Sequence, residues 1–180
     1  MIRIPIPDGY VDWAKEETKK FDEQKVHDKY AFGGNYIGIL SERIFDEWLT
    51  KHQVPHTWLK FIKQDYSKPD FIINNHEFDL KCTFGQVLYI KDIKHEYYIF
   101  SRVNGNLKTL FVIGFIKGQK IKRLIEEDKL ELKQFDDRVN YIVPISEMTR
   151  IEEFFIHIFK ERDVWTRKII EEQNKILENC

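Results

Sequence analysis

Apolar side chains recur at helical spacing between residues 36 and 51. The apolar positions of this segment are Ile37, Leu40, Ile44, Phe45, Trp48 and Leu49. At about 100° of rotation per residue they fill one broad arc, which is typical of a helix that packs on a sheet. Glu42 falls at the edge of the arc, where its carboxylate could reach the sheet surface. The alternative is a boundary residue that pairs with a nearby Lys or Arg.

A pattern that repeats every two residues, as expected of β-strands, follows this helix. Residues 70–83 form two short runs of apolar and alternating residues around the sequence Asn-Asn-His, which predicts a β-hairpin. Because side chains alternate across a strand, Asp79 and Lys81 share one face of the second strand. Asp70, which opens the first strand, joins that face if the loop has an even length.

Two positions are possible for a loop of even length in this hairpin. A two-residue loop at 74–75 pairs Asp70 with Asp79, and a loop at 75–76 pairs Asp70 with Lys81. Either register gathers the two carboxylates and the lysine on one face. An odd loop without a bulge would separate them, and the hairpin face would then be an ordinary solvated one.

Further patterns complete the expected organisation. They predict helices over 11–28, 121–127, 147–160 and 162–178, and strands over 57–63, 97–103, 109–116, 130–132 and 141–143, while 87–90 either extends the hairpin or forms a short strand. We therefore expect an α/β fold, with a mixed central sheet flanked by helices and extra helices at both ends.

The length of 180 residues suits one domain. We expect this single domain to span 1–180, with a core over roughly 36–116 and a C-terminal helical extension over 146–178. The extension carries a strong apolar stripe, which either packs on its own core or forms the contact of a homodimer.

The facing carboxylates of Asp70 and Asp79 suggest a chemistry. Two carboxylates that lie close together repel each other, and a divalent cation removes that repulsion. Oxygen ligands alone favour Mg²⁺, with Mn²⁺ as a substitute, over zinc. The hairpin is thus a candidate metal site, for which Glu42 would supply a third carboxylate.

The order of these residues resembles a known family. A helical Glu42, an Asp70 that follows a proline, and the tripeptide Asp79-Leu80-Lys81 resemble the PD-(D/E)XK nuclease superfamily, which has the restriction-endonuclease-like fold. The resemblance covers roughly residues 36 to 116. It implies a restriction-endonuclease-like core and metal-dependent hydrolysis of phosphodiester bonds.

The resemblance also implies a role for each residue. Asp70 and Asp79 would bind the metal together with the backbone carbonyl of Leu80. Glu42 would bind it directly or through water. Lys81 would orient or deprotonate the attacking water and stabilise charge on the phosphate.

The distribution of charge agrees with a nucleic-acid substrate. The whole chain has a net charge of −1, but residues 56–123 contain 12 Lys and Arg against six Asp and Glu. The cations that could contact a DNA backbone, or equally form an ordinary soluble surface, are Lys60, Lys63, Lys68, Lys91, Lys94, Arg102 and Lys108.

Other features indicate the compartment. The two cysteines, Cys82 and Cys180, make no disulfide framework, which fits a reducing cytosol. No apolar run approaches the length needed to span a membrane, and the first residues lack a signal-peptide pattern. We expect a cytoplasmic protein with no membrane partner.

Three functions remain open from the sequence. The leading hypothesis is a metal-dependent nuclease acting on DNA, an endonuclease of restriction, repair or recombination type, with RNA not excluded. The second is a non-catalytic nucleic-acid-binding or structural domain with a nuclease-like fold. The third is a globular domain whose acidic and basic residues coincide by chance, which predicts no binding of Mg²⁺ or Mn²⁺.

Overall fold

A computed structural model describes residues 1–24, 35–59, 68–135, 138–158 and 171 of the chain. The elements are β1 (Ile2–Pro5), α1 (Tyr10–Gln24), α2 (Asn35–Lys51), β2 (His56–Trp58), β3 (Phe71–Ile73), β4 (His76–Thr83), β5 (Val87–Ile90), β6 (Tyr97–Val103), β7 (Thr109–Lys117), α3 (Gly118–Glu126), β8 (Glu131–Phe135), β9 (Arg138–Pro144), the 3₁₀ turn η1 (Ile145–Glu147), β10 (Thr149–Arg150) and α4 (Ile151–Ile158).

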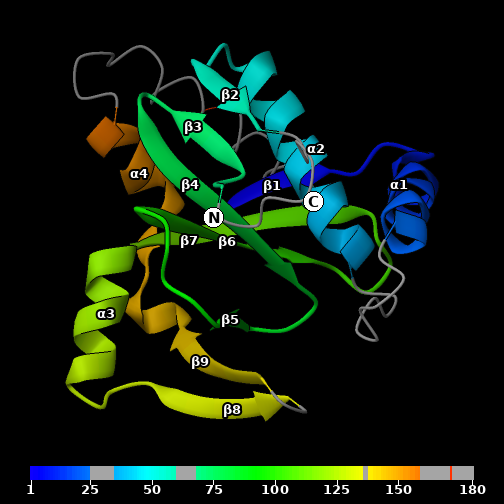
Figure 1. Cartoon of the computed structure of the whole chain (residues 1–180). Coiled ribbons are helices and arrows are strands. Elements are labelled where there is room, and N and C mark those ends of the chain that lie inside the picture. The colour runs from blue at the N-terminus through cyan, green and yellow to red at the C-terminus, as the bar shows by residue number, and fades with distance from the viewer. Residues whose placement is uncertain (25–34, 60–67, 136–137, 159–170, 172–180) are drawn as a thin grey trace.

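A mixed sheet forms the centre of the molecule (Figure 1). Its strand order is β1-β7-β6-β4-β3-β2, and β10 pairs with β7. The pair β4–β6 is parallel, and the other pairs in this sheet are antiparallel. The expected fold class, a mixed α/β fold with a mixed central sheet flanked by helices, is confirmed.

The hairpin β3–β4 has the two-residue loop at 74–75. Phe71 pairs with Phe78, and Ile73 pairs with His76. Asn74 and Asn75 have φ angles of 48° and 65°, as a tight hairpin turn requires of both central residues. Asparagine tolerates this left-handed conformation better than most residues do, so the local sequence determines the register that positions Asp70.

Two hydrophobic clusters lie on the two faces of the central sheet. On one face α1, α2 and α4 pack over Phe71, Phe78 and Leu80. On the other face Tyr98 and Phe100 pack with α3 and with a second, three-stranded sheet of order β5-β9-β8. Strand alternation therefore directs Phe78 and Leu80 toward α2, and Asp79 and Lys81 to the opposite face.

Some elements differ from the sequence-based expectation. Strand β1, which was not expected, pairs with β7 at the edge of the sheet. The helical extension expected from residue 146 begins at Ile151, because Thr149–Arg150 first pairs with β7. A Cβ atom at Gly114 would lie 2.6 Å from the backbone oxygen of Thr149, so glycine allows this close approach. The helix expected over 162–178 and most of the strand expected over 57–63 lie outside the described residues.

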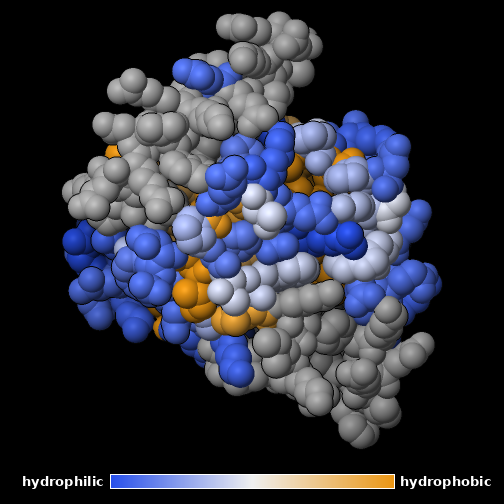
Figure 2. Space-filling model, turned by 90° about the horizontal axis from the view of Figure 1, so that it is seen from above, coloured by the Kyte–Doolittle hydropathy of each residue, from blue (hydrophilic) through white to orange (hydrophobic). Residues whose placement is uncertain are grey.

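The surface agrees with a chain that is one-third charged. Figure 2 looks down on the molecule and shows a mostly hydrophilic face on which apolar side chains form small separate areas. Among the described helices, none combines the length and the apolar character needed to cross a membrane.

Candidate functional site

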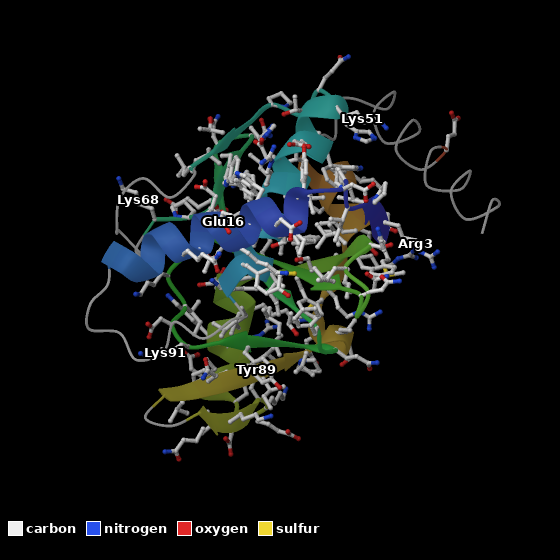
Figure 3. The ribbon with its side chains drawn as sticks, turned by 90° about the vertical axis from the view of Figure 1, so that its right-hand side faces the viewer. Arg3, Glu16, Lys51, Lys68, Tyr89 and Lys91 are labelled. Atoms are coloured by element: carbon white, nitrogen blue, oxygen red, sulfur yellow. The ribbon has the colours of Figure 1, made fainter. Side chains whose placement is uncertain are left out.

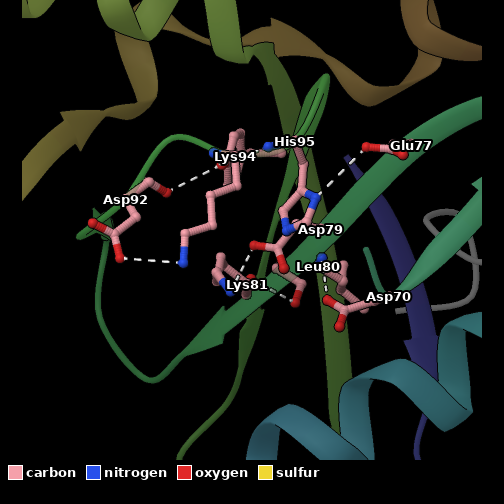
Figure 4. A network of polar contacts seen from close by, with 10 residues as sticks. Asp70, Glu77, Asp79, Leu80, Lys81, Asp92, Lys94 and His95 are labelled. Atoms are coloured by element: carbon pink, nitrogen blue, oxygen red, sulfur yellow. Dashed lines mark hydrogen bonds and ion pairs between the residues drawn. The ribbon is translucent and has the colours of Figure 1, made fainter. Parts of the chain in front are cut away.

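Asp70 lies where β3 and β4 stop pairing. Its backbone N–H donates to the oxygen of Phe78 at 2.9 Å, and the ladder ends there. Its carboxylate Oδ2 then accepts a hydrogen bond from the backbone N–H of Leu80 at 2.7 Å (Figure 4). The side chain thus takes the place of the next backbone hydrogen bond between the two strands. It is fixed against the backbone of the Asp-Leu-Lys tripeptide.

Asp79 and Lys81 form an ion pair on β4. The Lys81 Nζ atom lies 2.6 Å from Asp79 Oδ2, and the exposed fractions of the two side chains are 43% and 8%. Burial lowers the pKa of Lys81, but the carboxylates of Asp79 and Asp70 outweigh this effect and raise it overall. Lys81 is therefore a cation at neutral pH, held at the edge of a buried acidic group.

Glu42 is buried on α2 with 7% of its surface exposed. Its Oε2 atom accepts a hydrogen bond of 3.1 Å from the indole N–H of Trp58 on β2. Burial raises the pKa of Glu42 to about 7, although the hydrogen bond from Trp58 and the charge of Lys81 act in the opposite direction. The pKa of Glu42 therefore lies close to neutral pH.

The charges of these residues influence one another. Burial raises the pKa of Asp70 well above its ordinary value, and the carboxylates of Glu42 and Asp79 raise it further. The structure therefore brings Glu42, Asp70, Asp79 and Lys81 into one electrostatic cluster. With three acids and one lysine, full ionisation of this cluster leaves a net negative charge.

Tyr98 holds the segment that borders this cluster. Its position on β6 is directly opposite Asp79 in the parallel ladder. Its hydroxyl accepts hydrogen bonds from the backbone N–H groups of Lys94 and His95, at 2.8 and 3.2 Å, and donates to the oxygen of Asp92 at 3.2 Å. Sequence reasoning missed Tyr98, and also Trp58, because neither role follows from local spacing.

The donor set suits a hard divalent cation, but the side chains do not form a ready metal site. In the part of the chain that the structure describes, no three His, Cys, Asp or Glu side chains are arranged to hold a metal ion. Each carboxylate is engaged by a donor of the protein: Asp70 by the Leu80 N–H, Asp79 by Lys81, and Glu42 by Trp58. Each also keeps a second oxygen, and oxygen ligands are those that Mg²⁺ prefers.

The predicted nucleic-acid contacts are spread over two regions. Lys68 and Lys91 are exposed and lie on the same side of the molecule in Figure 3. Lys94 is also exposed and pairs with Asp92 at 3.6 Å.

The remaining predicted contacts lie elsewhere. Arg102 is half-buried at the far end of β6, and Lys108 lies in the following turn, 3.4 Å from Asp8. Lys60 and Lys63 lie outside the described residues.

No family model matches this chain, and no curated protein matches it. Among solved structures the chain is similar to that of D212, a nuclease from a fusselovirus. The alignment covers 82% of this chain and 98% of the other, with 13% sequence identity and a TM-score of 0.37. A similarity at this level does not bear on individual residues, so the interpretation of the site rests on its geometry.

Proposed function

We propose that this protein is a divalent-metal-dependent nuclease that hydrolyses phosphodiester bonds in DNA. The observation that carries the proposal is the gathering of Asp70, Asp79 and Lys81 around the backbone of Leu80, where β3 and β4 separate. Glu42 adds a third, buried carboxylate to the same electrostatic cluster. A cluster with an excess of buried negative charge is stabilised when a cation binds.

The chemistry proposed for the site follows from its donors. Asp70, Asp79, the carbonyl of Leu80 and Glu42 would hold Mg²⁺ or Mn²⁺. A bound cation of this kind lowers the pKa of a coordinated water and offsets the charge of phosphate oxygens. Lys81 remains protonated beside its carboxylates, so its role in this proposal is to orient the water and to stabilise charge on the phosphate.

The test is cleavage of supercoiled plasmid and of single-stranded DNA and RNA in the presence of Mg²⁺, Mn²⁺ or EDTA. We expect metal-dependent cleavage that is lost in the Asp79→Ala variant, because this change removes both a metal ligand and the partner of Lys81. Glu131→Ala is the matched control, since Glu131 opens a second acidic-Leu-Lys tripeptide on the exposed strand β8. Equal cleavage by wild type and Asp79→Ala would contradict the proposed site.

A second candidate function is supported by a specific observation. Each carboxylate already has a donor within the protein, as expected of a non-catalytic nucleic-acid-binding domain that needs no metal. Calorimetry with Mn²⁺ separates the two functions. Binding of Mn²⁺ that is lost in Asp79→Ala supports the nuclease, whereas DNA binding without Mn²⁺ binding or cleavage supports the alternative.

A further inference from the structure

An exposed aromatic ring lies on the turn that follows the candidate site. Strand β4 ends at Thr83, and the turn to β5 consists of Phe84, Gly85 and Gln86. Phe84 is 50% exposed, and among the described side chains no other aromatic ring is exposed. It belongs to neither hydrophobic cluster of the described residues. Turn positions usually hold small or polar residues, so the ring at this position is not explained by packing.

The backbone that carries this ring is held on both sides. Thr83 pairs with Arg102 in the parallel ladder, so the sheet fixes the residue before Phe84. The backbone N–H of Gly85 donates to the hydroxyl oxygen of Thr83, which closes the turn. A phenylalanine side chain has two rotatable bonds. A ring on such a backbone therefore loses little conformational freedom when it binds a ligand.

The turn lies away from α3, which covers part of this face of the sheet. Tyr97 on β6 pairs with Phe78 at one side and with Lys117 at the other, and α3 begins directly after Lys117. Thr83 lies five residues further along β4. Figure 1 shows α3 at one side of the molecule and the turn between β4 and β5 at the other. A ligand can therefore reach Phe84 from solvent without passing beneath α3 or the second sheet.

The ring is also close to the cations of the candidate site. Three residues along the chain separate Lys81 from Phe84, so their Cα atoms are at most about 10 Å apart. The side chain of Lys81 is 43% exposed. That of Lys94 is 49% exposed, and its ammonium lies 3.6 Å from Asp92. A nucleotide joins an anionic phosphate to a flat base through one sugar, so cations beside an exposed ring match both of its parts.

We propose that Phe84 stacks on a base next to the phosphate held at the candidate site, so that the substrate is a nucleic-acid strand with unpaired bases. The inference rests on the proposed function, because it names the substrate class of the same site. Bases inside a duplex are stacked on one another, and their faces are not available to a protein ring. Every base has such a face, so the contact selects an unpaired strand rather than a sequence.

The experiment measures the binding of a fluorescein-labelled single-stranded DNA of about 20 nucleotides by anisotropy. It is done in EDTA and, in parallel, with Ca²⁺, which takes the same oxygen ligands as Mg²⁺. We expect Phe84→Ala to bind the strand about tenfold more weakly than wild type, because one base loses its stacking partner. The slope of log affinity against log salt should stay the same, since no phosphate contact is lost.

Three further variants make the result specific. Phe84→Trp keeps an aromatic ring and should bind at least as tightly as wild type. Phe84→Leu keeps an apolar side chain without a ring and should bind within about twofold of Phe84→Ala. Ile156→Ala is the matched control, because it removes an exposed apolar side chain on α4, which packs on the other face of the sheet. It should change affinity less than about twofold.

A duplex of the same sequence tests the substrate class. Wild type should bind it more weakly than the single strand, and Phe84→Ala should match wild type on the duplex within about twofold. An equal loss on the duplex would overturn the proposal. Wild-type affinity of Phe84→Ala or of Phe84→Leu for the single strand would also overturn it, as would a wild type that binds no single strand in either buffer.

The design separates this inference from the proposed nuclease activity. If wild type binds the strand through Phe84 but cuts nothing in Mg²⁺ or Mn²⁺, the stacking stands and the nuclease proposal fails. If wild type cuts DNA and Phe84→Ala binds and cuts the single strand equally well, the stacking fails and the nuclease stands. If both hold, Phe84→Ala should lower kcat/KM on the single strand by about the same factor as the affinity.

Discussion

Two strands of this molecule carry nearly the same tripeptide in very different surroundings. Asp79-Leu80-Lys81 lies on β4, and Glu131-Leu132-Lys133 lies on β8. Both strands belong to antiparallel hairpins, and both alternate charged with apolar residues. The exposed fraction of Leu80 is 3%, whereas that of Leu132 is 61%.

The difference lies in what packs around each strand. Strand β4 is paired on both sides, by β3 and β6, and α2 covers its apolar face. Strand β8 pairs only with β9 among the described strands, and its described side chains are exposed. Burial places Asp79 near two further carboxylates and raises the pKa of Asp70, whereas Glu131 remains at the surface. The tripeptide alone therefore does not distinguish the two strands; burial beside Asp70 and Glu42 distinguishes the candidate site on β4 from the exposed strand β8.

The largest expected contrast concerns the lysines of the two tripeptides. Lys81→Ala should lower the rate of DNA cleavage by about 10³-fold, because it removes a fixed cation from the reacting phosphate. Lys133→Ala, the matched change on β8, should leave the rate within about twofold of wild type. Single-turnover rates at saturating Mg²⁺ measure both effects.

Metal binding gives the control for this comparison. Lys81 is not proposed as a ligand, so Lys81→Ala should still bind Mn²⁺ in calorimetry. If Lys81→Ala cleaves DNA at the wild-type rate, its assigned role is wrong. If Lys133→Ala is as impaired as Lys81→Ala, the contrast between the two tripeptides is wrong.

The leucines give the next contrast, in stability. Leu80→Ala should lower the free energy of unfolding by about 3 kcal/mol, since it leaves a cavity in the core beneath α2. Leu132→Ala should change it by less than about 0.5 kcal/mol, because the side chain is mostly exposed. Urea unfolding followed by circular dichroism measures both. A loss of several kcal/mol in Leu132→Ala would mean that β8 is covered in solution.

The parts of the site that follow from local rules could be predicted from the sequence. The paired asparagines at 74–75 predict the two-residue turn, and that turn fixes the register near Asp70. The helical spacing of apolar residues also predicts α2 and places Glu42 at the edge of its buried arc. These features depend on residues within about ten positions of one another.

The parts that depend on distant pairing could not be predicted. Trp58 reaches Glu42, and Tyr98 lies beside Asp79, only because β2 and β6 take their places in the sheet. Strand β1 left a weak signal, the alternation of Ile2 and Ile4, but Pro5 argues against a strand except at an edge.

The smallest expected contrast concerns the two glutamates, Glu42 and Glu131, and it depends on pH. Because burial raises the pKa of Glu42 from 4.5 to about 7, the folded state binds this proton more tightly than the unfolded state does. Stability should therefore fall as pH rises from about 4.5 to 7, as Glu42 ionises inside the protein. In Glu42→Gln this loss is removed, so the variant should be more stable than wild type at pH 8, by on the order of 2 kcal/mol, and similar to it at pH 5.

Urea unfolding at both pH values in EDTA tests this prediction, with Glu131→Gln as the matched exposed control. The control should differ little from wild type at either pH, because an exposed carboxylate loses no hydration on folding. Excess Mg²⁺ should stabilise the wild type at pH 8 more than it stabilises Glu42→Gln, if the carboxylate is a metal ligand. A Glu42→Gln variant that is less stable than wild type at pH 8 would show that the ionised carboxylate stabilises the fold through Trp58 and Lys81. In that case Glu42 would be a structural residue, and the two carboxylates on the hairpin would have to bind the metal without it.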